Sequence, residues 1–405
     1  MFPRLAEHVI LRNLEVPMLY DIWNEEMWEL DEEALAALQY FTGTWQLEEI
    51  ANELQLKKAE ILSLVEELGP NIVVDKHIMG EPFKLSPAQS PVPSLRTILF
   101  HVTFVCNLNC RHCYLDKMKG IHINPDLFLS TVYQLEKLQG LKILISGGEP
   151  LLHPQIFEML EALKTIKLRK MLLSNGMLID EKIARKLKDF VHEVQISVDG
   201  TDSHDEFRNN QNAFVKAIQA IKYLTKEGVD VSVATMIHSQ NIDELSTLES
   251  ILKDLHVKSW VLDVPSKTGE FLKYPELVPS IKEAGEALNK YGWGAPFEEI
   301  NEIYACGAHL CAVMPNGDVT KCGFFSEKPV GNLTQMNLVD CWHLIRKEFI
   351  WKQEELDCAS LNCPYLQDCR GGCRFRALLD TDKLFGIDRV KCASFNFNHL
   401  KKGEK

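Results

Sequence analysis

Residues 98–113 read ILFHVTFVCNLNCRHC, an apolar run that leads directly into three closely spaced cysteines. The run has the length and apolar character of a buried strand, and the spacing after it is Cys106-x3-Cys110-x2-Cys113. Three thiolates on one loop can hold three irons of a [4Fe–4S] cluster and leave the fourth iron open to another ligand. The spacing alone also allows a zinc site or ordinary loop cysteines.

Further apolar runs follow the first one along the chain. The strand candidates are residues 98–104, 142–145, 171–173, 193–198, 230–236 and 260–264, with helical patterns such as 126–139 and 213–227 between most of them. Repeated strand–helix units of this length predict an α/β fold in which a parallel sheet has helices on its outside. We expect a partial (β/α)6 TIM-like barrel over residues 95–303, with its site at the carboxyl ends of the strands.

Composition and charge exclude several classes of protein. Of the 405 residues, 46% are hydrophobic and 25% are charged, as in ordinary globular proteins. We find no run of 18 or more apolar residues and no signal-peptide pattern at the N-terminus, so we expect a cytoplasmic protein without a membrane partner. The net charge is −13, and residues 1–80 hold 5 Lys/Arg against 16 Asp/Glu. Phosphate backbones repel such an acidic region, so nucleic acid is not an expected partner.

Residues 1–80 combine short β-type runs with helical patterns. The β-type runs are residues 9–14, 18–23 and 27–30, the helical patterns are 31–41, 46–54 and 57–68, and a last apolar run covers 72–74. These are the parts of a winged helix-turn-helix domain, which we expect over residues 1–80. Residues 81–94 predict a linker because they contain Pro82, Pro87, Pro91 and Pro93.

The chain has twelve cysteines in a compartment that keeps thiols reduced, so disulfides are not expected. Three of them lie at residues 106–113 and nine lie after residue 305, with none between Cys113 and Cys306. This clustering favours metal ligation over scattered core cysteines. Cysteines, glycines and short loops dominate from Tyr304 onward, and they predict a metal-stapled domain over residues 304–405.

The cysteine loop and the motifs after it resemble the radical S-adenosylmethionine superfamily. The later motifs are Ser146-Gly147-Gly148-Glu149-Pro150, Ser174-Asn175-Gly176 and Ser197-Val198-Asp199-Gly200, followed by Arg208. The resemblance implies that Cys106, Cys110 and Cys113 hold a [4Fe–4S] cluster. It also implies that S-adenosylmethionine is contacted by Gly147, Gly148, Glu149, Asn175, Ser197, Asp199 and Arg208. The implied chemistry is reductive formation of a 5′-deoxyadenosyl radical that abstracts a hydrogen atom.

Three ring-bearing residues near the loop have no role fixed by the motifs. His112 stands where the family usually has a bulky residue over the adenine, so we interpret it as a packing residue. Tyr114 and His101 fit either the core or the site. The sequence identifies no catalytic acid or base.

The later cysteines resemble the SPASM extension of peptide-modifying radical enzymes. They form Cys306-x10-Gly317-x4-Cys322 and Cys358-x4-Cys363-x5-Cys369-x3-Cys373-x18-Cys392, where the common form has two residues between the first pair of the long run. The resemblance implies two auxiliary [4Fe–4S] clusters, one on Cys306, Cys311, Cys322 and Cys373 and the other on Cys358, Cys363, Cys369 and Cys392. The role of Cys311 stays open, because one auxiliary cluster of this family sometimes keeps an open site. Cys341 is expected to be a small apolar core residue.

The front domain resembles the PqqD peptide chaperone of PQQ biosynthesis. The matching stretches are Pro17-Met18-Leu19-Tyr20-Asp21, Trp28-Glu29-Leu30-Asp31, Thr42-Gly43-Thr44 and Glu48-Glu49-Ile50-Ala51. Such domains bind a leader peptide as an added β-strand, here at the strands between Val9 and Leu30. The resemblance therefore implies a precursor-peptide partner for residues 1–80, with flavodoxin or ferredoxin as the electron donor.

These resemblances imply an enzyme that forms a thioether or carbon–carbon crosslink in a ribosomally made peptide, or epimerises one of its residues. One alternative is tetrapyrrole, haem or other cofactor biosynthesis. Another is protein maturation of the anaerobic sulfatase type, although Gly323 follows Cys322 where that group has an acidic residue. A redox-sensing regulator that uses the front domain is the non-enzymatic alternative.

Overall fold

The computed structural model describes residues 1–75, 81–115, 120–294 and 303–397. The chain divides into two compact units. Unit 1 comprises Met1–Arg96, Tyr133–Lys142 and Thr165–Arg169, and unit 2 comprises Thr97–Val132, Ile143–Lys164 and Lys170–Lys405. Within the described ranges, every helix is too short or too polar to span a lipid bilayer.

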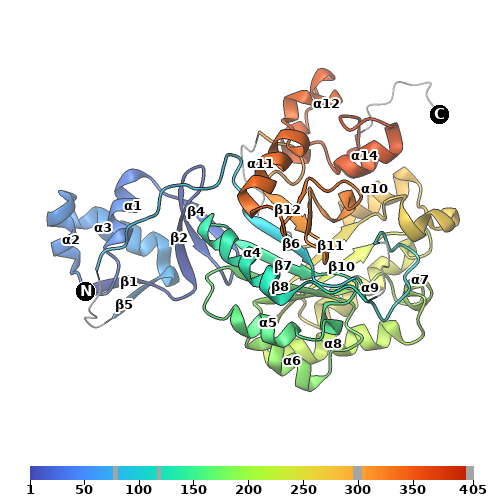
Figure 1. Ribbon diagram of the computed structural model, residues 1–405, viewed down its shortest axis with the longest axis horizontal. Helices are drawn as coiled ribbons and strands as arrows, with labels where there is room; N and C mark the ends of the chain where they lie inside the picture. The colour runs from blue at the N-terminus through green and yellow to red at the C-terminus, as the bar shows by residue number, and fades with distance from the viewer. Residues whose placement is uncertain (76–80, 116–119, 295–302, 398–405) are drawn as a thin grey trace. The chain divides into compact units, whose positions relative to one another are not determined.

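Unit 1 contains two small antiparallel sheets and a group of helices. Its strands are β1 Phe2–Leu5, β2 Val9–Asn13, β3 Pro17–Asp21, β4 Glu26–Glu29 and β5 Ile72–Asp75. Its helices are α1 Glu32–Gln39, α2 Leu47–Leu54 and α3 Lys58–Leu68. Strand β1 pairs with β5, and β2, β3 and β4 form a meander. The expected strands and helices are present, and β1 is an addition to them (Figure 1).

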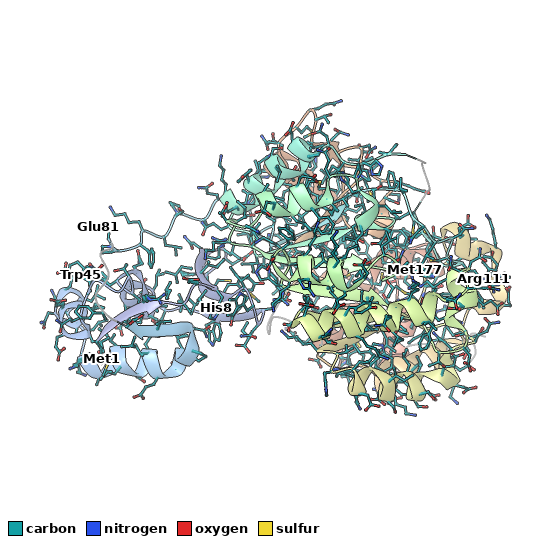
Figure 2. All side chains as sticks on the ribbon, turned by 90° about the horizontal axis from the view of Figure 1, so that it is seen from below. Met1, His8, Trp45, Glu81, Arg111 and Met177 are labelled. Atoms are coloured by element: carbon teal, nitrogen blue, oxygen red, sulfur yellow. The ribbon has the colours of Figure 1, made fainter. Side chains whose placement is uncertain are left out.

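The meander of unit 1 has two apolar faces, because side chains alternate along each strand. Leu19 and Trp28 pack on one face against the core formed with the helices. Tyr20 and Met27 lie on the other face and pack against Leu141, which the later part of the chain contributes to this unit. Figure 2 labels His8 and Trp45, which both belong to unit 1.

Unit 2 is built on a sheet whose central strands follow chain order. Six strands are β6 Thr97–His101, β7 Lys142–Ser146, β8 Arg169–Ser174, β9 Glu193–Ser197, β10 Asp230–Met236 and β11 Ser259–Asp263. The helices between them are α4 Pro125–Lys137, α5 Ile156–Ala162, α6 Glu181–Lys188, α7 His204–Arg208, α8 Ala213–Glu227 and α9 Leu245–Asp254, and α10 Ile281–Lys290 follows β11. Helices α5, α6 and α8 run along the outside of this sheet (Figure 1). The expected α/β architecture with a mostly parallel sheet is confirmed.

The sheet extends beyond the six strands that the sequence predicts. Its order is β11-β10-β9-β8-β7-β6-β12-β13-β14, where β12 is Leu310–Val313, β13 is Asp318–Thr320 and β14 is Gly331–Asn332. Strand β12 pairs parallel to β6, and β13 and β14 continue antiparallel. The first strands of the cysteine-rich region therefore complete the sheet instead of forming a separate one.

Helices make up most of the cysteine-rich region that follows. They are α11 Leu338–Phe349, α12 Asp357–Ser360, α13 Leu366–Cys369, α14 Arg374–Thr381 and α15 Arg389–Ser394. Helix α15 packs closely on α10, where a Cβ added at Gly285 would lie 2.3 Å from the Cβ of Ala393. The absence of a side chain at Gly285 allows this contact, which fixes the cysteine-rich region against the barrel helices.

Candidate active site

The cysteines of the first loop follow β6 and lie near one another. Cys110 is buried, and Cys106 and Cys113 are partly exposed. The backbone N–H of Leu108 donates a hydrogen bond to the Cys106 sulfur at 3.4 Å. Burial, together with the nearby thiols of Cys110 and Cys113, raises the pKa of Cys106 to about 11. The Cys106 thiol is therefore protonated at neutral pH, and a bound metal has to displace its proton.

Gly147 and Gly148 pack against the backbone that leads into this loop. A Cβ at Gly147 would lie 2.4 Å from the Thr103 carbonyl oxygen, and one at Gly148 would lie 2.3 Å from the Val105 carbonyl oxygen. Two hydrogen bonds hold the segments together, from Gly148 N–H to the Thr103 carbonyl at 2.7 Å and from Glu149 N–H to the Val105 carbonyl at 2.8 Å. Any larger residue would push the two segments apart. The glycine pair therefore sets the position of the cysteine loop.

The Glu149 carboxylate is fully buried and joins the ends of β7 and β8. It accepts hydrogen bonds from the Ser174 hydroxyl at 2.9 Å and from the Asn175 N–H at 2.8 Å. Burial raises the pKa of Glu149 to about 7, against the lowering effect of these bonds. The Asn175 side chain in turn donates to the Asn107 side-chain oxygen at 2.8 Å, which ties β8 to the cysteine loop.

Asp199 and Arg208 form a buried ion pair beside the loop. The Arg208 Nε donates to Asp199 Oδ2 at 2.5 Å, and the Met236 N–H donates to Asp199 Oδ1 at 2.8 Å. Burial alone would raise the pKa of Asp199, but Arg208 holds it well below its usual range. Arg208 also lies 3.8 Å from the Cys110 sulfur through Nη1. The pair therefore links the cysteine loop to the ends of β9 and β10, while Ser197 lies half-buried at the end of β9.

Aromatic rings stack beside this ion pair. His112 lies 4.5 Å from Phe207 with an interplanar angle of 9°, and Phe207 lies 4.0 Å from His238 at 19°. Burial, followed by the Arg208 charge, lowers the pKa of His112 to about 3. His112 therefore stays neutral and acts in packing, as the sequence indicated. Phe207 and His238 carry no motif of their own, and only the neighbouring Arg208 pointed to this position.

A second segment that the sequence did not single out holds the far side of the loop. Gly269 has a positive φ of 56°, and a Cβ there would lie 2.5 Å from the Cys113 carbonyl oxygen. The Glu270 N–H donates to the same carbonyl at 3.0 Å. Arg111, labelled with Met177 in Figure 2, is fixed by an ion pair to Glu206 at 2.8 Å. Backbone contacts therefore hold the cysteine loop at both of its ends, near Val105 and at Cys113.

A large cavity of about 940 Å³ lies within unit 2. Gln195 of β9 and Val261 and Asp263 of β11 line it, together with several aromatic rings. These rings are Trp260, Tyr291, Trp293, Tyr114 and Phe324. The cavity offers space for a sizeable substrate close to the cysteine loop, since Tyr114 immediately follows Cys113.

Cys306, Cys322 and Cys373 also line this cavity. The Cys373 N–H donates to Asp388 Oδ2 at 2.8 Å. A buried cation, Lys321, lies beside Cys306 and Cys322, and burial lowers its pKa to about 8. The structure therefore brings together three of the four cysteines expected for the first auxiliary cluster.

Cys311 lies on the opposite face of the sheet. Its neighbour Leu310 lines the cavity, so the alternation along β12 points the Cys311 side chain away from it. Cys311 pairs in register with Ile98 and is 1% exposed. Burial and the nearby Cys341 thiol raise the pKa of Cys311 above the usual thiol range. The structure therefore separates Cys311 from Cys306, Cys322 and Cys373, and places it with Cys341 in the core.

The remaining cysteines surround a small hollow in the C-terminal region. Its lining contains Cys358, Cys363, Cys369 and Cys392, with Tyr365, Leu366, Phe395 and Phe397 around them. Burial, helped by the thiols of Cys358 and Cys369, raises the pKa of Cys392 to about 12. The four cysteines expected for the second auxiliary cluster are therefore gathered around one point.

The donor chemistry fits iron–sulfur clusters at these three places, since each offers three or four thiols from short loops or helix ends. Among the described residues, no three His, Cys, Asp or Glu side chains are close enough together to hold a single metal ion. A four-iron cluster binds each thiolate to a different iron and does not need that closer gathering.

Comparison with known proteins finds similarity over much of unit 2. Residues 100–251 match the model of the Radical SAM superfamily. The chain is 24% identical over 333 residues to AdoMet-dependent heme synthase of Oleidesulfovibrio alaskensis, which covers 70% of this chain and 84% of that protein. It is 26% identical over 318 residues to the antilisterial bacteriocin subtilosin biosynthesis protein AlbA of Bacillus subtilis, which covers 71% of this chain and 68% of that protein.

A solved structure shares the fold over nearly the whole length. SuiB of Streptococcus suis, bound to precursor peptide SuiA, is similar with a TM-score of 0.70 at 16% identity, over 96% of this chain and 99% of that chain. The family match, the three-cysteine loop after β6 and the motifs at the ends of the next strands agree with one another. Residues 100–251 of this chain therefore resemble a domain of the radical SAM superfamily, whose members use S-adenosylmethionine and a [4Fe–4S] cluster.

Proposed function

We propose that this chain modifies a ribosomally made peptide by radical S-adenosylmethionine chemistry. In that chemistry the cofactors supply a 5′-deoxyadenosyl radical, which takes a hydrogen atom from the substrate. The protein would provide the thiolates, orient the substrate in the cavity and exclude water. The product would contain a thioether or carbon–carbon crosslink, or an epimerised residue.

Cys106, Cys110 and Cys113 would hold the cluster that binds S-adenosylmethionine. Residues at the ends of the strands would form the binding site for S-adenosylmethionine. They are Gly147, Gly148, Glu149, Asn175, Ser197, Asp199 and Arg208. Their contacts with one another support this set, because the Glu149 and Asp199 networks both reach the cysteine loop. Several of them would act by fixing the loop rather than by touching the cofactor.

Two auxiliary clusters would complete the metal content. Cys358, Cys363, Cys369 and Cys392 would hold one of them, around the hollow that they line. Cys306, Cys322 and Cys373 would hold the other, beside the large cavity. Cys311 is left out of this proposed set because its side chain points to the other face of β12. An electron donor such as flavodoxin or ferredoxin would supply reducing electrons.

The proposal that the substrate is a peptide depends on the β2–β3–β4 meander of unit 1, which has one free edge. Strand β2 is covered along its outer edge, where the Asn13 N–H donates to the Gln139 side chain at 2.7 Å and Arg12 donates to the Lys167 carbonyl at 2.7 Å. Strand β4 pairs with β3 alone among the described strands. A leader peptide can add to such an edge as a further strand. Residues 1–80 would therefore be a PqqD-like, winged-helix-type recognition domain, with 81–94 as a linker, 95–303 as the radical SAM core and 304–405 as a SPASM domain.

The relatives support this proposal as well. AlbA acts in the biosynthesis of the bacteriocin subtilosin, and SuiB has been crystallised with its precursor peptide. The test is anaerobic reconstitution of the full chain with each short peptide encoded beside its gene. We expect 5′-deoxyadenosine together with a peptide that has lost two hydrogens for a crosslink, or that has gained solvent deuterium for an epimer. If the chain cleaves S-adenosylmethionine but leaves every such peptide unchanged, the peptide proposal is wrong.

A tetrapyrrole substrate is the second candidate, and the similarity to AdoMet-dependent heme synthase favours it. The aromatic rings that line the cavity could also pack against a flat ring system. Unit 1 argues for the peptide, because a free strand edge has no use in binding a tetrapyrrole. Incubation of the reconstituted protein with iron coproporphyrin distinguishes the two, since only the second candidate predicts a change in its side chains.

A further inference from the structure

The backbone of β4 offers hydrogen-bonding groups at defined residues. The Leu30 N–H donates to the Pro17 carbonyl at 2.9 Å, next to the register pair Met18 and Glu29. In an antiparallel ladder, hydrogen-bonded and non-bonded pairs alternate. The backbone groups of Trp28 therefore face β3, and those of Met27 and Glu29 face away from the meander. A further strand would form its hydrogen bonds to Met27 and Glu29.

The four side chains of β4 follow a simple order, which is acidic, apolar, apolar and acidic. Met27 and Trp28 are partly buried, and each packs on a different face of the meander. Glu26 and Glu29 are exposed at the two ends of the strand, and neither forms an ion pair with another residue that the structure describes. The adjacent Glu25, in contrast, is paired with Lys142. The free edge thus combines two unpaired charges with two apolar side chains between them.

We propose that the peptide segment that pairs with β4 carries the pattern basic–apolar–apolar–basic. Residues directly opposite each other in neighbouring strands share one face of the sheet, so each residue of the added strand meets one side chain of β4. Basic residues opposite Glu26 and Glu29 would pair with the free carboxylates. Apolar residues opposite Met27 and Trp28 would extend the two apolar faces. The pattern reads the same in both directions, so it holds for either orientation of the added strand.

The surroundings of β4 favour the same partner. Asp31, Glu32 and Glu33 follow the strand at the start of α1, and all three are exposed. Together with Glu26 and Glu29, these side chains form an acidic cluster. Such a cluster attracts a basic peptide over several ångströms and raises its association rate at low salt. The inference rests on the proposed function, because it names the chemistry of the leader that the peptide proposal requires.

The test measures binding of short peptides to the full chain by fluorescence anisotropy. The probe GSTKVIKTSG carries the proposed pattern, and two matched probes replace both of its lysines with glutamine or with glutamate. Two cross-strand ion pairs favour the basic probe over the glutamine probe by about 2- to 30-fold in Kd. This preference should shrink as salt is added. A fourth probe, N-methylated at all four residues of the basic pattern, should not bind, because it has lost every N–H that could pair with β4.

Charge reversal locates the effect on β4. The double variant Glu26→Lys/Glu29→Lys should invert the order, so that the glutamate probe binds more tightly than the lysine probe. The control variant Glu53→Lys/Glu67→Lys makes the same change in net charge at exposed positions of α2 and α3 and should keep the original order. If the order of affinities for the lysine and glutamate probes changes equally in both variants, the inference is wrong.

The outcomes separate this inference from the peptide proposal. If the glutamine probe binds as tightly as the lysine probe, the charge pattern is wrong, while strand addition at β4 stands. If the N-methylated probe binds equally well, or if no probe binds, pairing with β4 is wrong. Modification of a precursor by the reconstituted enzyme is measured independently, so it can succeed or fail without changing these results.

Discussion

Replacement of Gly148 by alanine tests how the barrel positions the cysteine loop. The new Cβ would lie 2.3 Å from the Val105 carbonyl oxygen and 2.9 Å from the Phe104 carbonyl oxygen. Both contacts involve backbone atoms, so no flexible side chain can move to relieve them. The φ of Gly148 lies outside the left-handed region, and the contact is the sole cost of the substitution.

The structure sets the size of this cost. To reach an ordinary separation of 3.4 Å, the two backbone segments have to move apart by about 1 Å. That movement breaks the bonds from Gly148 N–H to the Thr103 carbonyl and from Glu149 N–H to the Val105 carbonyl. Two lost hydrogen bonds contribute about 1 kcal/mol each, and the remaining strain contributes about 1–3 kcal/mol. We expect Gly148→Ala to lower the free energy of unfolding by about 3–5 kcal/mol.

Urea unfolding of the metal-free chain measures this change, and iron analysis after anaerobic reconstitution measures the displacement of the loop. We expect Gly148→Ala to lose about a third of the bound iron, the share of one of three clusters. Gly228→Ala is the matched control, because it adds the same methyl group where the nearest heavy atom is 3.9 Å away. Its positive φ costs about 1–2 kcal/mol and should leave the iron content unchanged. Wild-type stability and iron content in Gly148→Ala would show that the close contact of Gly148 with Val105 does not set the position of the loop.

Further predictions concern the auxiliary site and the buried carboxylates. Cys322→Ala should remove about a third of the iron while Cys311→Ala removes none, and equal losses in the two variants would return Cys311 to the ligand set. Asp199→Asn leaves Arg208 buried without its partner and should cost about 3–5 kcal/mol in urea unfolding, so a change below about 1 kcal/mol would contradict the ion pair. The Glu149 carboxyl has a pKa of about 7 when folded, so it stays neutral while the unfolded chain ionises. The stability of the metal-free chain should therefore fall by about 3 kcal/mol between pH 4.5 and pH 7, and Glu149→Gln should lose this part of the pH dependence.

The sequence predicted the central sheet because each strand contains several apolar residues close together. Parallel strands covered on both faces need apolar residues at nearly every position, which makes them easy to recognise. Strand β12 was missed because its four residues, Leu310–Val313, lie in a region dominated by cysteines. Its pairing with β6 depends on contacts between segments that lie far apart in the chain.

The sequence predicted those parts of the site whose residues lie close together in the chain. The loop from Cys106 to Cys113 and the glycines after β7 stand out in the sequence. Their packing did not, because the close approach of Gly148 to Val105 is visible only in three dimensions. The contact of Gly269 with the loop has the same origin.

Cys311 shows a different limit of sequence reasoning. Its spacing from Cys306 suits a shared cluster, but ligation depends on the face of the strand to which the side chain points. A shift of one residue in a strand moves a side chain to the other face. The alternation of side chains along β12 turns Cys311 away from the cavity that Cys306, Cys322 and Cys373 line, and the spacing of the cysteines contains no information about this direction.

We expect Cys106, Cys110 and Cys113 to support cleavage of S-adenosylmethionine. The direct test compares 5′-deoxyadenosine formation by the anaerobically reconstituted wild type and the triple variant Cys106→Ala/Cys110→Ala/Cys113→Ala, each with a chemical reductant. We predict product from the wild type and none from the variant, which should still retain about two thirds of the iron in its auxiliary clusters. Equal 5′-deoxyadenosine formation by both proteins would show that the three cysteines are not needed for cleavage. Its absence in a wild type that carries a full complement of iron would show that the chain does not cleave S-adenosylmethionine.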